Sequence, residues 1–115
     1  MEPFPATSVA LTEPNGLLAV GGDLSPERLI AAYRQGIFPW YSEGDPVLWW
    51  TPNPRAVLFP QAFHLSRSMR RVMAKQSFTL HVNKAFESVI RACAAPRAKE
   101  AGTWISPDMM AAYTQ

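Results

Sequence analysis

Short apolar runs separated by turn signals define the elements that this chain is expected to form. Leu17–Val20 is apolar throughout and lies between a turn signal at 13–16 and two glycines, which is typical of a short buried strand. Ser25 and Pro26 then stand as an N-cap and a first helical residue. The pattern therefore predicts a strand followed by a helix over 26–35.

The predicted helix places Leu29, Ile30 and Tyr33 on one face, which we expect to be its buried side. Gly36 should end it in the left-handed conformation. The segment 36–51 follows at once, and five of its sixteen residues are large aromatics, with prolines that exclude an ordinary helix. Such aromatics either close a core or stack on a planar ligand such as a nucleobase.

The pattern changes after the Thr-Pro-Asn-Pro string at 51–54, which we interpret as a domain boundary. Beyond it we expect a strand at 56–59 and a serine-capped helix over 65–75. A half-buried strand should follow, because three apolar residues alternate with polar ones. These are Phe78, Leu80 and Val82.

Two further helices are expected. Asn83 should cap the first, whose apolar face has the i, i+3, i+4, i+7 spacing of Phe86, Val89, Ile90 and Cys93. A polar loop at 96–102 and a short extended stretch at 103–105 then lead to the second, which starts at Ser106. This last helix ends at Gln115, and the predicted strands are too few to complete a sheet. We therefore expect the front part of a longer protein.

The composition is that of a globular protein of about one small domain, with 115 residues, 48% apolar and 17% charged. No apolar run approaches the ~18 residues needed to span a membrane. The first residues also lack the basic start and apolar middle of a secretory signal. Cys93 is the single cysteine and cannot form an internal disulfide. We therefore expect a cytoplasmic protein with no membrane association.

The two halves of the chain differ in charge. Residues 1–54 hold two basic and six acidic residues, a net charge of −4, whereas 55–115 hold nine basic and three acidic ones, a net charge of +6. The helix predicted over 65–75 carries a basic stripe, and no acidic residue between 55 and 86 neutralises it. This stripe is either a solvated helix face or a surface that follows the phosphates of a polyanion. Its residues are Arg67, Arg70, Arg71 and Lys75.

No arrangement of residues indicates a catalytic or metal site. His64 and His81 are too isolated to bind a metal together with one cysteine. Cys93 lies on the apolar face of a predicted helix, so we expect an inert buried thiol. The glycines at 21–22 lack the spacing and the Lys-Ser/Thr ending of a phosphate loop. The carboxylates of Asp23, Glu43 and Asp45 lie in predicted turns and form no acid–base pair.

Several ordered, tryptophan-rich strings resemble the leucyl/phenylalanyl-tRNA–protein transferase family. They span 13–24, 33–40, 45–58, 64–71 and 102–105, so the resemblance covers nearly the whole chain from about residue 13 onward. It implies an α+β fold with a small N-terminal α/β domain at 1–53. The beginning of a GNAT-like acyltransferase domain, truncated, would then occupy 54–115.

The resemblance also implies a function. Members of this family are cytoplasmic bacterial aminoacyltransferases of the N-end rule pathway. They move Leu or Phe from Leu-tRNA or Phe-tRNA to proteins that begin with Arg or Lys, which marks those proteins for degradation. No metal or organic cofactor is expected, because the aminoacyl ester is already activated.

Matching positions carry the family's tRNA-binding residues into this sequence. Trp40 and Trp104 correspond to the two indoles that hold the terminal adenosine of the tRNA. The basic stripe falls where family members carry basic residues toward the tRNA stem. Trp49 and Trp50 are adjacent on an extended segment and point to opposite faces, so we assign them mainly to packing.

The sequence departs from the family pattern in two ways. The segment 94–101 is longer and less acidic than its counterparts. The family's catalytic carboxylate and amide residues, its side-chain pocket and its acceptor site all lie downstream of residue 115, so we expect this chain alone to be inactive. A stand-alone tRNA- or RNA-binding module without enzymatic activity, and a non-functional truncated product, are the alternatives.

Overall fold

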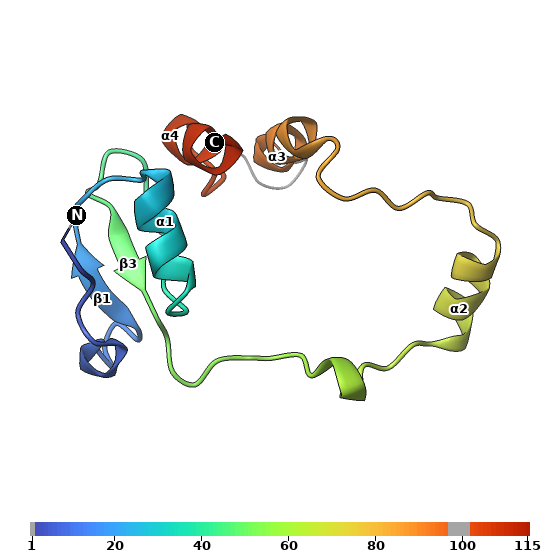
Figure 1. Cartoon of the computed structure of the whole chain (residues 1–115), viewed down its shortest axis with the longest axis horizontal. Coiled ribbons are helices and arrows are strands. Elements are labelled where there is room, and N and C mark those ends of the chain that lie inside the picture. The colour runs from blue at the N-terminus through green and yellow to red at the C-terminus, as the bar shows by residue number, and fades with distance from the viewer. Residues whose placement is uncertain (1, 97–101) are drawn as a thin grey trace. The chain divides into compact units, whose positions relative to one another are not determined.

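The computed structural model describes residues 2–96 and 102–115 (Figure 1). Two compact units make up the chain: one contains the residues up to Pro54 together with Ala85–Gln115, and the other is Arg55–Lys84. Helices and a small antiparallel sheet make the chain α+β, as predicted. The elements are the 3-10 turns η1 (Thr7–Val9) and η2 (Pro60–Ala62), the strands β1 (Leu17–Val20), β2 (Phe38–Pro39) and β3 (Leu48–Trp50), and the helices α1 (Pro26–Tyr33), α2 (Arg67–Ala74), α3 (Phe86–Ala94) and α4 (Pro107–Thr114).

The sheet has the strand order β1-β3-β2, with both pairs antiparallel. The central strand β3 places Trp50 opposite Leu17 on one side and opposite Phe38 on the other. The predicted strand at Leu17–Val20 is thus confirmed in position, and the aromatic segment forms the other two strands. The strand is not buried as predicted, since three of its residues are only partly buried and Val20 is 62% exposed. Its backbone is therefore fixed on both sides of β3.

Helix α1 begins where the local signals predicted and ends at Tyr33, two residues before the predicted end. The Ser25 hydroxyl accepts a hydrogen bond from the Arg28 amide at 3.3 Å, which caps the first turn. Gly36 ends the helical segment at φ +72°, and the amide of Ile37 donates to the carbonyl of Ala32 at 2.9 Å. Prediction and structure therefore agree on the start of this helix and on the turn at Gly36.

The buried face of α1 differs from the prediction. Leu29 and Ala32 are buried, whereas Ile30 and Tyr33 are about half exposed. The i, i+3 pair of Leu29 and Ala32 packs with Ile37 and Trp49 in the core cluster, which does not include Ile30. The expected face was therefore correct only for its first residue.

Trp49 is the largest fully buried side chain in the described part of the chain. Its indole Nε1–H donates to the carbonyl of Gly21 at 2.9 Å, so its polar edge is satisfied inside the core. The Phe4 ring meets it edge-on at 5.0 Å, and the Arg28 guanidinium lies 3.6 Å from the centre of the Phe4 ring. The N-terminal segment is thereby held against the core of the first unit.

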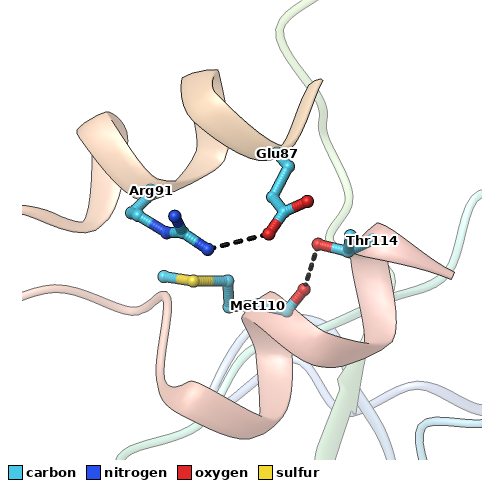
Figure 2. Close-up of polar contacts among 4 residues, drawn as sticks. All are labelled: Glu87, Arg91, Met110 and Thr114. Carbon is cyan, nitrogen blue, oxygen red and sulfur yellow. Dashed lines mark hydrogen bonds and ion pairs between the residues drawn. The ribbon is translucent and has the colours of Figure 1, made fainter. Parts of the chain in front are cut away.

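Helices α3 and α4 pack on each other and belong to the first unit. In Figure 2, the exposed Glu87–Arg91 ion pair of α3 (2.8 Å) faces Met110 of α4. The hydroxyl of Thr114 donates to the Met110 carbonyl at 2.6 Å. The start of α4 is confirmed, since the Ser106 hydroxyl accepts from the amide of the third residue beyond it.

The predicted cap and apolar face of α3 are only partly correct. The N-cap is Ala85, without a side-chain hydrogen bond, and Asn83 instead adopts a positive φ of 58°. Asparagine tolerates this conformation, so Asn83 turns the chain before the helix begins. Of the predicted apolar face only Ile90 is buried, because α3 contacts α4 on one side and borders a cavity on another.

The second unit contains α2 but neither of the strands predicted for it. Ser66 caps α2 as expected. The segments 56–59 and 78–82 pair with no strand in the described part of the chain, and Phe78 and Leu80 are 88% and 91% exposed. An alternating pattern becomes a strand only when a neighbouring strand satisfies its backbone groups, so these two predictions are wrong for this chain.

The remaining predictions concern the region before α4. Residues 97–101 of the predicted polar loop lie outside the described residues. The stretch 103–105 is bent at Trp104 instead of extended, because the amide of Ser106 donates back to the Trp104 carbonyl at 3.0 Å. Among the helices in the described ranges, none is long and apolar enough to cross a membrane. The predicted two-domain division at residue 53 stays a prediction.

Candidate functional site

Trp40 and Trp104 form a stacked pair in the first unit. Their ring centroids lie 5.2 Å apart with an angle of 25° between the ring planes. The two residues keep 49% and 37% of their surface exposed. A pair of indoles that is both stacked and half exposed presents a flat apolar surface with polar edges to solvent.

The backbone of Trp40 is held by β3. Its amide donates to the carbonyl of Leu48 at 2.9 Å, and its carbonyl accepts from the indole Nε1–H of Trp50 at 2.7 Å. Trp50 therefore contacts the site through a hydrogen bond, whereas its neighbour Trp49 points to the other face and closes the core. The sequence interpretation, which left both tryptophans mainly to packing, applies fully only to Trp49.

Trp104 is held by its own bend and by α4. The amide of Ile105 donates to the Thr103 hydroxyl at 3.1 Å, which stabilises the turn on which the indole sits. The ring of Tyr113 meets Trp104 edge-on, with centroids 6.1 Å apart and planes at 84°. The Tyr113 hydroxyl in turn shares a hydrogen bond of 2.5 Å with that of Tyr33.

Tyr113 is a residue of the site that was not predicted from the sequence. A signal was present, because Tyr113 follows the buried Met109 by four positions and so lies on the same face of α4. Burial, and after it the hydrogen bond to Tyr33, raises the pKa of the Tyr113 hydroxyl above its ordinary value of 10.0. The hydroxyl is thus held to Tyr33 while the ring of Tyr113 supports Trp104.

A cavity of about 840 Å³ lies beside the indole pair. Its lining includes apolar residues of α3, among them Phe86, Val89 and Cys93, together with Trp40 and Trp104. Cys93 is exposed there, so the prediction of a buried thiol is wrong: its helix face borders the cavity instead of a core. An apolar cavity bordered by stacked indoles can accept a planar aromatic group.

The four basic residues of the predicted stripe lie on α2 or at its C-terminal end, in the second unit. All four are exposed, and the structure records no salt bridge for them within the described residues. The amide of Lys75 donates to the Arg71 carbonyl at 3.1 Å, which continues the helix to the last basic residue. Arg67, Arg71 and Lys75 thus repeat at intervals of one helical turn, with Arg70 beside them.

The carboxylates do not gather into a further site. Asp23 accepts a hydrogen bond from the amide of Ser25 at 3.0 Å, which lowers the pKa of its carboxyl group and supports the start of α1. Within residues 2–96 and 102–115, no group of three or more His, Cys, Asp or Glu side chains could hold a metal ion.

Comparison with known proteins gives matches over nearly the whole chain. Residues 22–53 match the model of the leucyl/phenylalanyl-tRNA protein transferase N-terminal domain, and residues 57–115 match that of leucyl/phenylalanyl-tRNA protein transferase. A protein of Nitrosomonas eutropha named leucyl/phenylalanyl-tRNA–protein transferase is 60% identical over 112 residues, which are 97% of this chain and 48% of that protein.

Relatives with the same name come from other bacteria. That of Psychromonas ingrahamii is 57% identical over 96% of this chain and 46% of its own length. That of Pseudomonas aeruginosa is 55% identical over 97% of this chain and 50% of its own length. The chain spans about half the length of the curated relatives that it matches. With a family model over more than half of its residues and relatives of this similarity, the chain belongs to the leucyl/phenylalanyl-tRNA protein transferase family.

Proposed function

We propose that this chain is the aminoacyl-tRNA-binding part of an aminoacyltransferase. The complete protein would move Leu or Phe from its tRNA to the N-terminal Arg or Lys of acceptor proteins in the cytoplasm and so tag them for N-end rule degradation. The observation that carries the proposal is the exposed, stacked pair of Trp40 and Trp104 in a chain whose relatives are named for this transfer.

The indole pair is proposed to hold the terminal adenosine of the tRNA. Stacking on an aromatic side chain is worth ~1–3 kcal/mol per base and reads no sequence, which suits an end shared by all tRNAs. A base between the two rings needs two stacking distances, roughly 7 Å in total. The ring centroids of Trp40 and Trp104 are only 5.2 Å apart, so the indoles must move apart before a base can lie between them.

The basic stripe is proposed to contact tRNA phosphates. Four cations on or just after one short helix, with no acidic residue in the same unit, favour a polyanion over a protein of mixed charge. Such contacts position a nucleic acid without reading its sequence. The two features would therefore bind different parts of the tRNA. The indoles would hold its terminal adenosine, and the basic stripe would contact the phosphates of its stem through Arg67, Arg70, Arg71 and Lys75.

The transfer itself would be an aminolysis. The neutral α-amine of the acceptor attacks the ester carbonyl of the aminoacyl-tRNA, and the 3′-ribose oxygen leaves with the proton that the amine loses. Orientation of the amine against the ester should supply much of the rate. Residues of this chain would bind the tRNA, and proton transfer would fall to a part of the GNAT-like domain beyond it, so we expect no turnover by this chain alone.

The test combines binding with transfer. An oligonucleotide ending in CCA should quench tryptophan fluorescence, with an affinity that falls as salt rises. Trp40→Ala and Trp104→Ala should each weaken binding by roughly fivefold to a hundredfold. Phe78→Ala is the matched control, because it removes an 88% exposed aromatic from the second unit. Binding that is indifferent to both tryptophans would rule out the proposed site.

Transfer of labelled leucine from Leu-tRNA to a peptide that begins with Arg gives the second readout. No turnover from a folded chain that binds the oligonucleotide supports the proposal, since catalysis is assigned elsewhere. Clear turnover would show that residues 1–115 contain a catalytic group and would contradict the assignment of proton transfer to another part of the protein. The C-terminal half of a relative can then be added to this chain. If turnover still does not appear, a stand-alone RNA-binding module is favoured instead.

A further inference from the structure

We infer that Trp50 is a positioning residue for the indole pair, acting on Trp40 through its main chain. The inference has two parts. The first, that Trp50 keeps Trp40 and Trp104 stacked, does not depend on the proposed function. The second, that Trp50 thereby strengthens binding of the tRNA end, rests on it. The observed link is the hydrogen bond that the Trp50 indole donates to the Trp40 carbonyl.

The location of Trp40 explains why it needs such a contact. Trp40 is the first residue after β2, so the regular ladder with β3 is ending there. Its amide still reaches the Leu48 carbonyl at 2.9 Å, but its own carbonyl accepts from no backbone amide of the described strands. The indole of Trp50 supplies the missing donor at 2.7 Å, a short distance for an N–H···O bond.

Trp50 is itself well placed to hold another residue. It lies in the central strand, between Leu17 of β1 and Phe38 of β2, so its backbone is fixed from both sides. Its side chain is only partly buried, unlike that of Trp49, and is therefore a minor part of the core. With both polar groups of the Trp40 backbone bound to β3, the indole of Trp40 leaves the main chain from a fixed point.

The adjacent tryptophans form a matched pair for an experiment. Trp49→Phe and Trp50→Phe both replace an indole by a smaller ring and both remove one hydrogen bond. Trp49 loses its bond to Gly21 inside the core, and Trp50 loses its bond to Trp40. A merely structural role predicts that the fully buried Trp49 matters more for every property.

Stacked indoles have a spectroscopic signature that separates the two roles. Coupled transitions of neighbouring indoles give a paired positive and negative band in far-ultraviolet circular dichroism, which Trp40→Phe should remove and so assign. We expect Trp50→Phe to reduce this couplet at least about twofold and to weaken CCA binding roughly threefold to tenfold. Trp49→Phe should lower the thermal midpoint more and yet keep the couplet.

Each result then has one interpretation. A full couplet in Trp50→Phe, or equal losses in both variants, overturns the inference. Loss of the couplet only in Trp50→Phe supports it even if the wild-type chain fails to bind CCA, in which case the proposed function alone fails. If the wild-type chain binds the CCA oligonucleotide tightly and Trp50→Phe binds it equally well, Trp50 does not contribute to ligand binding and that part of the inference is overturned.

A measurement on the unaltered chain covers the case in which Trp50→Phe does not fold. The four indole N–H signals can be assigned by single substitution of the other three tryptophans, and their hydrogen exchange compared. The Nε1–H of Trp50 should exchange more slowly than those of Trp40 and Trp104, and more slowly again at saturating CCA. Equal exchange at the three partly exposed indoles overturns the inference.

Discussion

The hydroxyl groups of Tyr33 and Tyr113 lie 2.5 Å apart and share a hydrogen bond between two helices that are distant in the sequence. Tyr33 ends α1, and Tyr113 lies near the end of α4. The two rings also meet edge-on, with centroids 6.2 Å apart. Because the same Tyr113 ring supports Trp104, this pair connects the packing of the first unit to the indole surface.

Removing either hydroxyl should therefore destabilise the first unit modestly. Tyr33→Phe and Tyr113→Phe should each lower the free energy of unfolding by about 1 kcal/mol, since both rings remain in place. The double variant should lose little more than either single one, because both substitutions break the same bond. Urea denaturation of the four proteins gives this comparison, and fully additive losses would show that the hydroxyls act independently.

Alkaline pH should weaken the same contact. Burial, and then the hydrogen bond to Tyr33, raises the pKa of Tyr113 above 10.0, so the folded chain retains a proton that the unfolded chain releases. The contribution to stability is complete below about pH 10 and is lost as the pH rises through the raised value. The thermal midpoint should therefore fall above about pH 10.

Tyr113→Phe should flatten this alkaline decline, whereas Tyr33→Phe should leave most of it. Burial is the larger cause of the raised pKa of Tyr113, and it persists without the Tyr33 hydroxyl. Desolvation and the Asp108 charge also raise the pKa of Tyr41, so a smaller decline should remain in Tyr113→Phe. Equal pH profiles for wild type and Tyr113→Phe would assign the effect to other groups.

Gly16 and Gly44 offer a matched test of backbone packing. Both have φ +93°, but a Cβ on Gly16 would lie 2.6 Å from the backbone of Pro52, whereas a Cβ on Gly44 would meet nothing within 4 Å. Gly44→Ala should cost about 1–2 kcal/mol for the left-handed conformation alone. Gly16→Ala should cost clearly more, since the Pro52 backbone must also shift, and equal midpoints in urea would contradict this packing.

The elements that the sequence predicted correctly are those with local causes. Ser25, Ser66 and Ser106 each accept a hydrogen bond from an amide three residues further on, so residues within a single turn determine where each helix starts. Gly36 turns the chain just after α1 for an equally local reason, its positive φ of 72°. Caps and stops could therefore be located without knowledge of the rest of the fold.

The errors concern features that need a partner. The alternation of Phe78 and Leu80 shows that one face suits burial, but it does not say which strand will cover that face. Cys93 fits an apolar helix face, yet that face borders a cavity. The contact between Trp40 and Trp104 depends likewise on the packing of α4, which no local pattern encodes.

The basic stripe should account for much of the salt dependence of RNA binding. Arg67→Ala and Arg71→Ala remove exposed cations from α2, and each lost phosphate contact should reduce the slope of log K against log salt by roughly 0.7–0.9. Binding of a tRNA acceptor-stem hairpin ending in CCA, titrated at several salt concentrations, measures this slope. Arg91→Ala is the matched control, because Arg91 is exposed in the first unit and paired with Glu87 at 2.8 Å. Slopes that respond equally to all three variants would indicate general attraction by net charge, whereas a change confined to α2 identifies the stripe as the phosphate-contacting surface.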